Sequence, residues 1–150
     1  MSGKTRAVLN LVEAWARRDI DFMMAQFADD AIFENVPMDL IVGKDDIRAA
    51  NQAFMTLYRE APWEIHHIVE AADGTVLTER SDIFILNDGR RTECRVMGAF
   101  TVNDDNLIVH WRDYFDLADW NRQLGADPDF GRKGYRQTEA TTAMAGSDQC

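Results

Sequence analysis

The stretch VLTERSDIFILNDGRRTECRVMGAFT, residues 76–101, holds two long runs of strand-forming residues on either side of Asn87-Asp88-Gly89. Glycine accepts the positive φ that tight hairpin turns demand, so the stretch predicts two long antiparallel strands joined at this turn. In the second strand, positions 92, 94, 96, 98 and 100 share one face, and the charged positions 91, 93 and 95 lie on the other.

The first of these strands carries charged side chains among apolar ones. Because side chains alternate across a strand, Arg80 and Asp82 share a face with three apolar residues, Val76, Phe84 and Leu86. The opposite face also mixes polar and apolar residues. Periodicity alone therefore leaves open which side of this strand is buried.

A second clue comes from the strand predicted over residues 107–117. Asp113 shares a face there with four large apolar residues, Leu107, Val109, Trp111 and Phe115. Ile108 and Tyr114 fall on the other face, where they could pack outward. Burying an isolated carboxylate costs several kcal/mol or more, so Asp113 needs a partner, and Arg80 is available between it and Asp82.

Two aspartates that share one arginine have a chemical use. One guanidinium fully neutralises only one carboxylate, so desolvation and mutual repulsion favour a single proton on the pair. Asp82 and Asp113 would then supply one acid and one base, as push–pull catalysis needs. The alternative is a structural ion pair at the end of a barrel or at solvent-exposed strand ends, because buried ion pairs need not be catalytic.

The rest of the chain shows helical patterns first and strand patterns last. This segregation predicts an α+β domain over residues 1–125, with helices packed on one face of a curved sheet. The Gly-, Ala- and Thr-rich segment 126–150 is expected to be a tail that is mobile or lies on the surface. Helices are predicted over 4–17, from a cap at Asp19 to 28–30, and over 44–60, and strands over 31–37, 63–71, 76–86, 91–101 and 107–117.

Composition narrows the possible functions. The chain has 150 residues and is 46% hydrophobic, which suits one domain, and its net charge of -10 argues against nucleic-acid binding. It lacks the roughly 18 consecutive apolar residues of a membrane span, and its N-terminus lacks a secretory signal, so we expect a cytoplasmic protein. The spacings of the two cysteines and three histidines predict no disulfide framework and no metal site.

Four motifs, in order and at matching separations, resemble the limonene-1,2-epoxide hydrolase family: FENVP at 33–37, TERSD at 78–82, GAF at 98–100 and WRDYFDL at 111–117. The resemblance spans about residues 7–121. It implies a mixed or antiparallel sheet wrapped with helices on its concave side, the cone also found in ketosteroid isomerase and scytalone dehydratase. It further implies a homodimer that needs no cofactor and hydrolyses an epoxide in one step, without a covalent ester.

The resemblance also implies a role for each polar residue of these motifs. Asp82 would protonate the epoxide oxygen, and Asp113 would take a proton from the attacking water. Arg80 would bridge the two carboxylates, and Asn35 would help to hold the water. One departure stands out, because the family has a tyrosine two residues before this asparagine and the present chain has Phe33.

The apolar residues around these motifs predict a pocket for a cyclic epoxide such as limonene-1,2-epoxide or cyclohexene oxide. An isomerase or cyclase with one catalytic aspartate, and a non-catalytic ligand-binding protein, remain alternatives on the same fold. The predicted substrate contacts are Phe33, Met38, Leu40, Phe54, Phe84, Val96, Trp111, Phe115 and Trp120.

Overall fold

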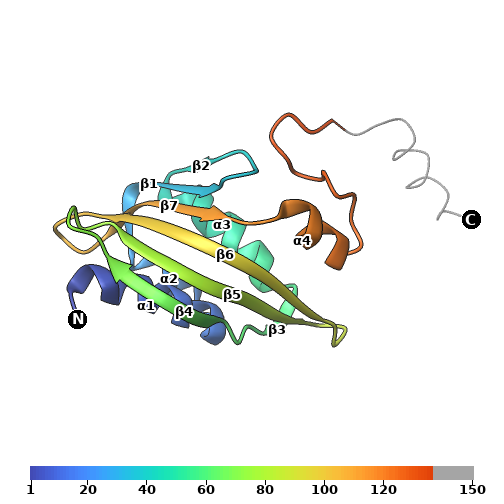
Figure 1. Cartoon of the computed structure of the whole chain (residues 1–150), viewed down its shortest axis with the longest axis horizontal. Helices are drawn as coiled ribbons and strands as arrows, with labels where there is room; N and C mark the ends of the chain where they lie inside the picture. Colours follow the sequence, from blue (N-terminus) through green and yellow to red (C-terminus); the bar gives the residue numbers. More distant parts are fainter. Residues whose placement is uncertain (137–150) are drawn as a thin grey trace, which may run out of the picture.

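The computed structural model describes residues 1–136 and confirms the α+β prediction (Figure 1). A curved mixed sheet has the strand order β2-β1-β7-β6-β5-β3, with β4 also paired to β5. The helices α1, α2 and α3 lie against one face of this sheet. The elements are α1 Gly3–Arg17, α2 Ile20–Met24, β1 Phe27–Asn35, β2 Ile41–Val42, α3 Lys44–Met55, β3 Tyr58–Glu60, β4 Glu64–Glu70, β5 Val76–Leu86, β6 Arg91–Val102, β7 Ile108–Tyr114 and α4 Leu117–Gln123.

The predicted hairpin is present as β5 and β6. Their register runs from Val76 opposite Phe100 to Ile85 opposite Arg91, and Gly89 has the positive φ of 90° that the turn requires. This register places Cys94 opposite Asp82. Strands β5 and β7, which carry the predicted catalytic residues, each pair with neighbouring strands on both sides.

Burial answers the question that the periodicity of β5 left open. Arg80 has no exposed surface, and Asp82 is only 7% exposed. Their apolar companions on that face, Val76, Phe84 and Leu86, are buried as well. The charged residues of β5 thus point into the same interior as the apolar ones, toward the helices.

The strand β7 departs from the predicted alternation at a β-bulge. Val102 pairs with Ile108, but the next pair joins Thr101 to His110, which leaves Val109 as an extra residue. Because the bulge breaks the period of two, Ile108 is fully buried together with Trp111. The expectation that Ile108 packs outward is wrong, whereas Tyr114 is half exposed as expected.

The third helix is shorter than the helical pattern predicted. It ends at Met55, and Tyr58–Glu60 form β3, which pairs with the end of β5. Tyr58 is fully buried, and its hydroxyl donates a hydrogen bond of 2.8 Å to the carbonyl oxygen of Trp15. A tertiary partner thus overrides the local helical preference at this point.

Two other boundaries also differ from the predictions. Residues 28–30, expected to end the second helix, belong to β1. The short helix α4, which the sequence patterns missed, begins at an N-cap formed by Asp116, whose side chain accepts from the backbone N–H of Asp119.

Helix α4 covers an edge that β7 leaves free. The ladder between β6 and β7 ends at Met97 and Tyr114, so the backbone of Glu93 has no strand partner on that side. The side chain of Gln123 replaces one, because it accepts from the N–H of Glu93 at 2.9 Å and donates to its carbonyl oxygen at 2.8 Å. This contact fixes α4, and with it Trp120, beside the inner face of the sheet.

The described part of the expected tail, residues 126–136, runs along the surface. The backbone N–H of Lys133 donates to the carbonyl oxygen of Pro37 at 3.0 Å, and Arg132 forms a β-bridge with Met38. Residues 137–150 lie outside the described residues, and the division of the chain at residue 125 stays a prediction. Across residues 1–136, none of the helices has the length and hydropathy needed to cross a membrane.

Candidate active site

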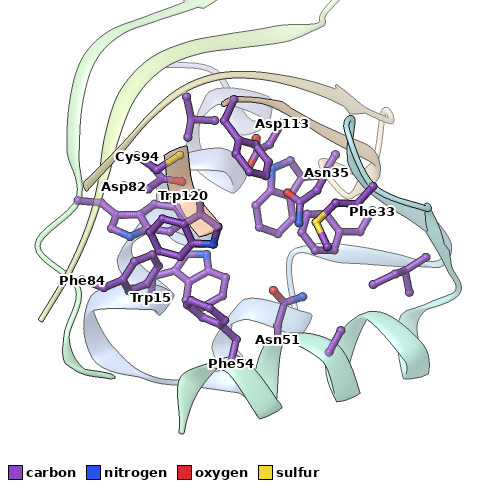
Figure 2. A pocket seen from close by; sticks show the side chains of 17 residues that line it. Trp15, Phe33, Asn35, Asn51, Phe54, Asp82, Phe84, Cys94, Asp113 and Trp120 are labelled. Carbon is purple, nitrogen blue, oxygen red and sulfur yellow. The ribbon is translucent and has the colours of Figure 1, made fainter. Parts of the chain in front are cut away.

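A cavity of about 270 Å³ lies between the sheet and α3, and most of the predicted site residues line it (Figure 2). Three of the predicted catalytic residues, Asn35, Asp82 and Asp113, line the cavity. Leu40 is the exception among the predicted substrate contacts, because it is 49% exposed and lies outside the cavity. The predicted contacts that do line the cavity are Phe33, Met38, Phe54, Phe84, Val96, Trp111, Phe115 and Trp120.

Arg80 lies behind this wall and joins the two carboxylates. Its Nε donates to Oδ1 of Asp82 at 2.7 Å, and one terminal nitrogen donates to Oδ2 of Asp82 at 3.1 Å and to Oδ2 of Asp113 at 2.5 Å. The other terminal nitrogen donates to the hydroxyl of Thr78 at 3.0 Å. The guanidinium therefore uses all of its nitrogens and is held in one orientation.

Burial raises the pKa of both aspartates against the opposing effect of the arginine. The pKa of Asp82 rises to about 7, first because of desolvation, which the charge of Arg80 counteracts and the charge of Asp113 reinforces. Desolvation also raises the pKa of Asp113, against the charge and hydrogen bond of Arg80 and a hydrogen bond of 2.7 Å from the indole N–H of Trp111. The raised pKa of Asp82 therefore lets the pair keep a proton up to about pH 7.

The charge of Arg80 itself is secure. Burial alone would lower the pKa of its guanidinium, but the facing Asp113 and Asp82 raise it above its usual value. The guanidinium also lies 5.2 Å from the ring of Trp63 and 6.0 Å from that of Phe100, within reach of a cation–π interaction. With one proton on the carboxylates, the Asp–Arg–Asp group has no net charge, which suits its buried position.

The parallel pairing of β1 with β7 brings Asn35 to Asp113. These two residues are register partners, and so are Phe33 and Trp111. The ring of Phe33 stacks on that of Trp111, with centroids 4.1 Å apart. The carboxylate of Asp113 and the amide of Asn35 thus lie side by side at the cavity wall. Phe33, which has no hydroxyl group, adds an apolar surface next to them.

Comparison with known proteins places this geometry in a family. Residues 2–125 match the limonene-1,2-epoxide hydrolase catalytic domain. The chain belongs to the limonene-1,2-epoxide hydrolase family. Epoxide hydrolase EphG of Mycobacterium tuberculosis (strain ATCC 25618 / H37Rv) is 35% identical over 119 residues, which cover 79% of this chain and 76% of that protein.

Solved structures agree with this membership. A structure of an M. tuberculosis LEH-like epoxide hydrolase has a TM-score of 0.69 and 34% identity, and the match covers 81% of this chain and 89% of that one. A protein with a ketosteroid isomerase-like fold from Catenulispora acidiphila, solved with trimethylamine, has a TM-score of 0.70 at 16% identity over 83% of this chain and 95% of that one. The latter shares the fold alone, whereas the former supports the activity. The chain is an epoxide hydrolase.

Several cavity residues of this family member escaped the sequence analysis. Cys94 could have been found, because the hairpin register puts it opposite Asp82. Trp15 and Asn51 lie on helices α1 and α3, and their only signal was a place on the apolar face of a helical pattern, which core residues share. Within residues 1–136, no three His, Cys, Asp or Glu side chains gather as a metal site would require.

Gly98 has a steric role that explains the small residue of the GAF motif. It faces Thr78 on one side and Asp113 on the other. A Cβ atom at this position would come within 2.3 Å of a terminal nitrogen of Arg80 and 2.6 Å of the hydroxyl of Thr78. Only glycine leaves room for the guanidinium where it passes over β6 to reach Asp113.

We expect Gly98→Ala to lower the free energy of unfolding by about 1–3 kcal/mol, the usual cost of overpacking, and to reduce epoxide hydrolysis by displacing Arg80. Urea unfolding and an epoxide-hydrolysis assay measure the two effects. The control is Ala99→Ser, one residue along on the other face of β6. Unchanged stability and activity in Gly98→Ala would contradict this role.

Proposed function

We propose that the enzyme adds water in one step to a small apolar cyclic epoxide, such as limonene-1,2-epoxide, and releases a vicinal diol. The observation that carries this proposal is the Asp82–Arg80–Asp113 group at the wall of an apolar cavity. Opening an epoxide without a metal requires a proton for the departing oxygen while a nucleophile attacks the carbon. One protonated and one ionised carboxylate facing the same space meet both requirements.

In this mechanism Asp82 is the acid and Asp113 is the base. The oxygen of water attacks an epoxide carbon and the bond from that carbon to the ring oxygen breaks. The ring oxygen takes the proton of Asp82, and Asp113 takes a proton from the attacking water. The proton then returns from Asp113 to Asp82 before the next turnover, with Arg80 holding both carboxylates in place.

The neighbours of the two aspartates support this assignment. Asn35 lies beside Asp113 in the register of β1 and β7, so an amide and a carboxylate can hold the water together. The pKa of Asp82, raised to about 7, keeps a proton available near neutral pH. With Phe33 in place of the family tyrosine, the water has two protein partners, which is within the two to four that ordered buried waters make.

The cavity supports a small and largely apolar substrate. Its volume of about 270 Å³ lies just below the roughly 300–1,000 Å³ typical of ligand pockets. Aromatic rings form much of its lining, among them Phe54, Phe84 and Trp120, whose centroids lie 5.0–6.2 Å apart. A monocyclic epoxide such as cyclohexene oxide or limonene-1,2-epoxide fits this size and polarity.

The reaction is tested with water enriched in ¹⁸O and limonene-1,2-epoxide or cyclohexene oxide, without added metal. We expect one labelled oxygen in the diol from the wild type, and a loss of at least about 100-fold in Asp82→Asn and Asp113→Asn, the usual worth of a general acid or base. Asp105→Asn, an equal change of charge in an exposed turn, is the control. A rearranged product without label would favour an isomerase or cyclase, and ligand binding without turnover would favour a binding protein.

The pH dependence of kcat/KM tests the shared proton. Activity requires Asp82 protonated and Asp113 ionised. We expect kcat/KM to fall as the pH rises above about 7, because Asp82 loses its proton there. We also expect kcat/KM to fall as the pH is lowered into the acid range, because Asp113 gains a proton at its raised pKa. A rate that rises to a plateau above pH 8 would contradict the acid role of Asp82.

A cytoplasmic location stays a prediction from the sequence.

We also propose that the protein is a homodimer. Met97 and Tyr114 are register partners on the outer face of the sheet and are 52% and 50% exposed, which supports an interface there. We expect a mass of twice the 17.1 kDa chain by light scattering, and a monomer for Met97→Glu but not for the control Leu57→Glu. A wild-type monomer at all concentrations would overturn the dimer.

A further inference from the structure

Asn51 is a polar residue in an apolar row of α3. It lies one turn after Ile47 and one turn before Met55, and the three side chains are 0–5% exposed. Its Nδ2 donates to the carbonyl oxygen of Ile47 at 2.8 Å. Since only the amide nitrogen can donate, this bond fixes the orientation of the amide and directs Oδ1 away from the helix backbone.

The Oδ1 atom of Asn51 has no hydrogen-bond donor among the described residues, although the residue is only 3% exposed. Asn51 lines the cavity, and Figure 2 shows its amide rising from α3 into the space across from Asp82 and Asp113. The indole nitrogens of Trp15 and Trp63 also lack partners, but packing encloses them completely. Asn51 therefore presents a free acceptor that a ligand can reach from the α3 side of the cavity.

An acceptor without a donor is costly in an apolar cavity. A ligand that displaced water from Oδ1 without supplying a donor would leave the acceptor unsatisfied, which costs roughly as much as the loss of a full hydrogen bond, and the cavity residues Ala50, Phe54 and Ile41 offer no side-chain donor. A leucine in this row would avoid that cost. An asparagine at this position is favourable when the ligand in the cavity supplies a hydrogen-bond donor to its Oδ1 atom.

We propose that Oδ1 of Asn51 accepts a hydrogen bond from a hydroxyl group of the substrate, at the end remote from the epoxide. This rests on the proposed function, because Asp82 and Asp113 hold the epoxide at the sheet side of the cavity and Asn51 faces them from the helix side. An ammonium would need a counter-charge that the cavity wall near α3 lacks. The substrate class is thus a hydroxylated cyclic epoxide rather than a pure hydrocarbon epoxide.

Two cyclohexene oxides of equal size test this, one with a hydroxymethyl and one with an ethyl group on the ring carbon opposite the epoxide. The measured quantity is the ratio of their kcat/KM values. Asn51→Leu should shift this ratio about tenfold toward the ethyl compound, as the loss of one hydrogen bond would. Asn51→Ala should shift it in the same direction. A ratio within twofold of the wild type in either folded variant overturns the proposal.

Phe54→Leu is the matched control, because it alters the same helix face without removing an acceptor. It should change the kcat/KM values of both compounds and leave their ratio within twofold of the wild type. A purely structural role of Asn51 would likewise lower both values together and would not shift the ratio.

A binding measurement separates this inference from the proposed reaction. Tryptophan fluorescence reports on the cavity, since Trp15, Trp111 and Trp120 line it. For the unreactive pair cyclohexylmethanol and ethylcyclohexane, Asn51→Leu should weaken the binding of the alcohol relative to that of the hydrocarbon by the same factor. If this shift appears without diol formation from any epoxide, the hydroxyl site stands and the proposed reaction falls. If diols form but neither ratio shifts, the reaction stands and the hydroxyl site falls.

Discussion

The guanidinium of Arg80 is fully buried, and it keeps its charge because two carboxylates face it. Removing a charge from water costs many kcal/mol, which only close ionic and hydrogen-bonded partners offset. Asp82 and Asp113 supply those partners from β5 and β7, so the ion group also links strands on either side of β6. Much of the surrounding structure follows from the need to complete this group without admitting bulk water.

The single positive charge between two aspartates sets the chemistry of the cavity. Two ionised carboxylates would leave an uncompensated negative charge in the interior, so the pKa of Asp82 is raised to about 7 and the pair keeps a proton up to about that pH. The same desolvation that makes the group costly therefore produces an acid next to a base. Gly98 permits the arrangement sterically, and the indole N–H of Trp111 supplies a further donor to Asp113.

The shape of the cavity depends on contacts between segments that are distant in the chain. The parallel pairing of β1 with β7 brings Asn35 beside Asp113. Gln123 ties α4 to the free edge of β6 and thereby fixes Trp120. Helix α3 closes the side across from the carboxylates and adds Asn51, a polar group in a wall that is otherwise apolar.

The sequence by itself determined the β5–β6 hairpin, the residues that share each face of its strands and the three charged residues, because backbone alternation and turn chemistry are local. Which face of β5 is buried was decided by the tertiary structure. Only the tertiary structure decided that β3 replaces the end of a helix, that a bulge buries Ile108, that Leu40 stays outside the cavity and that Asn51 faces it. These outcomes depend on which distant segments bury each other's surfaces. A local sequence pattern does not predict which segments pack together, since several different segments can cover the same apolar face.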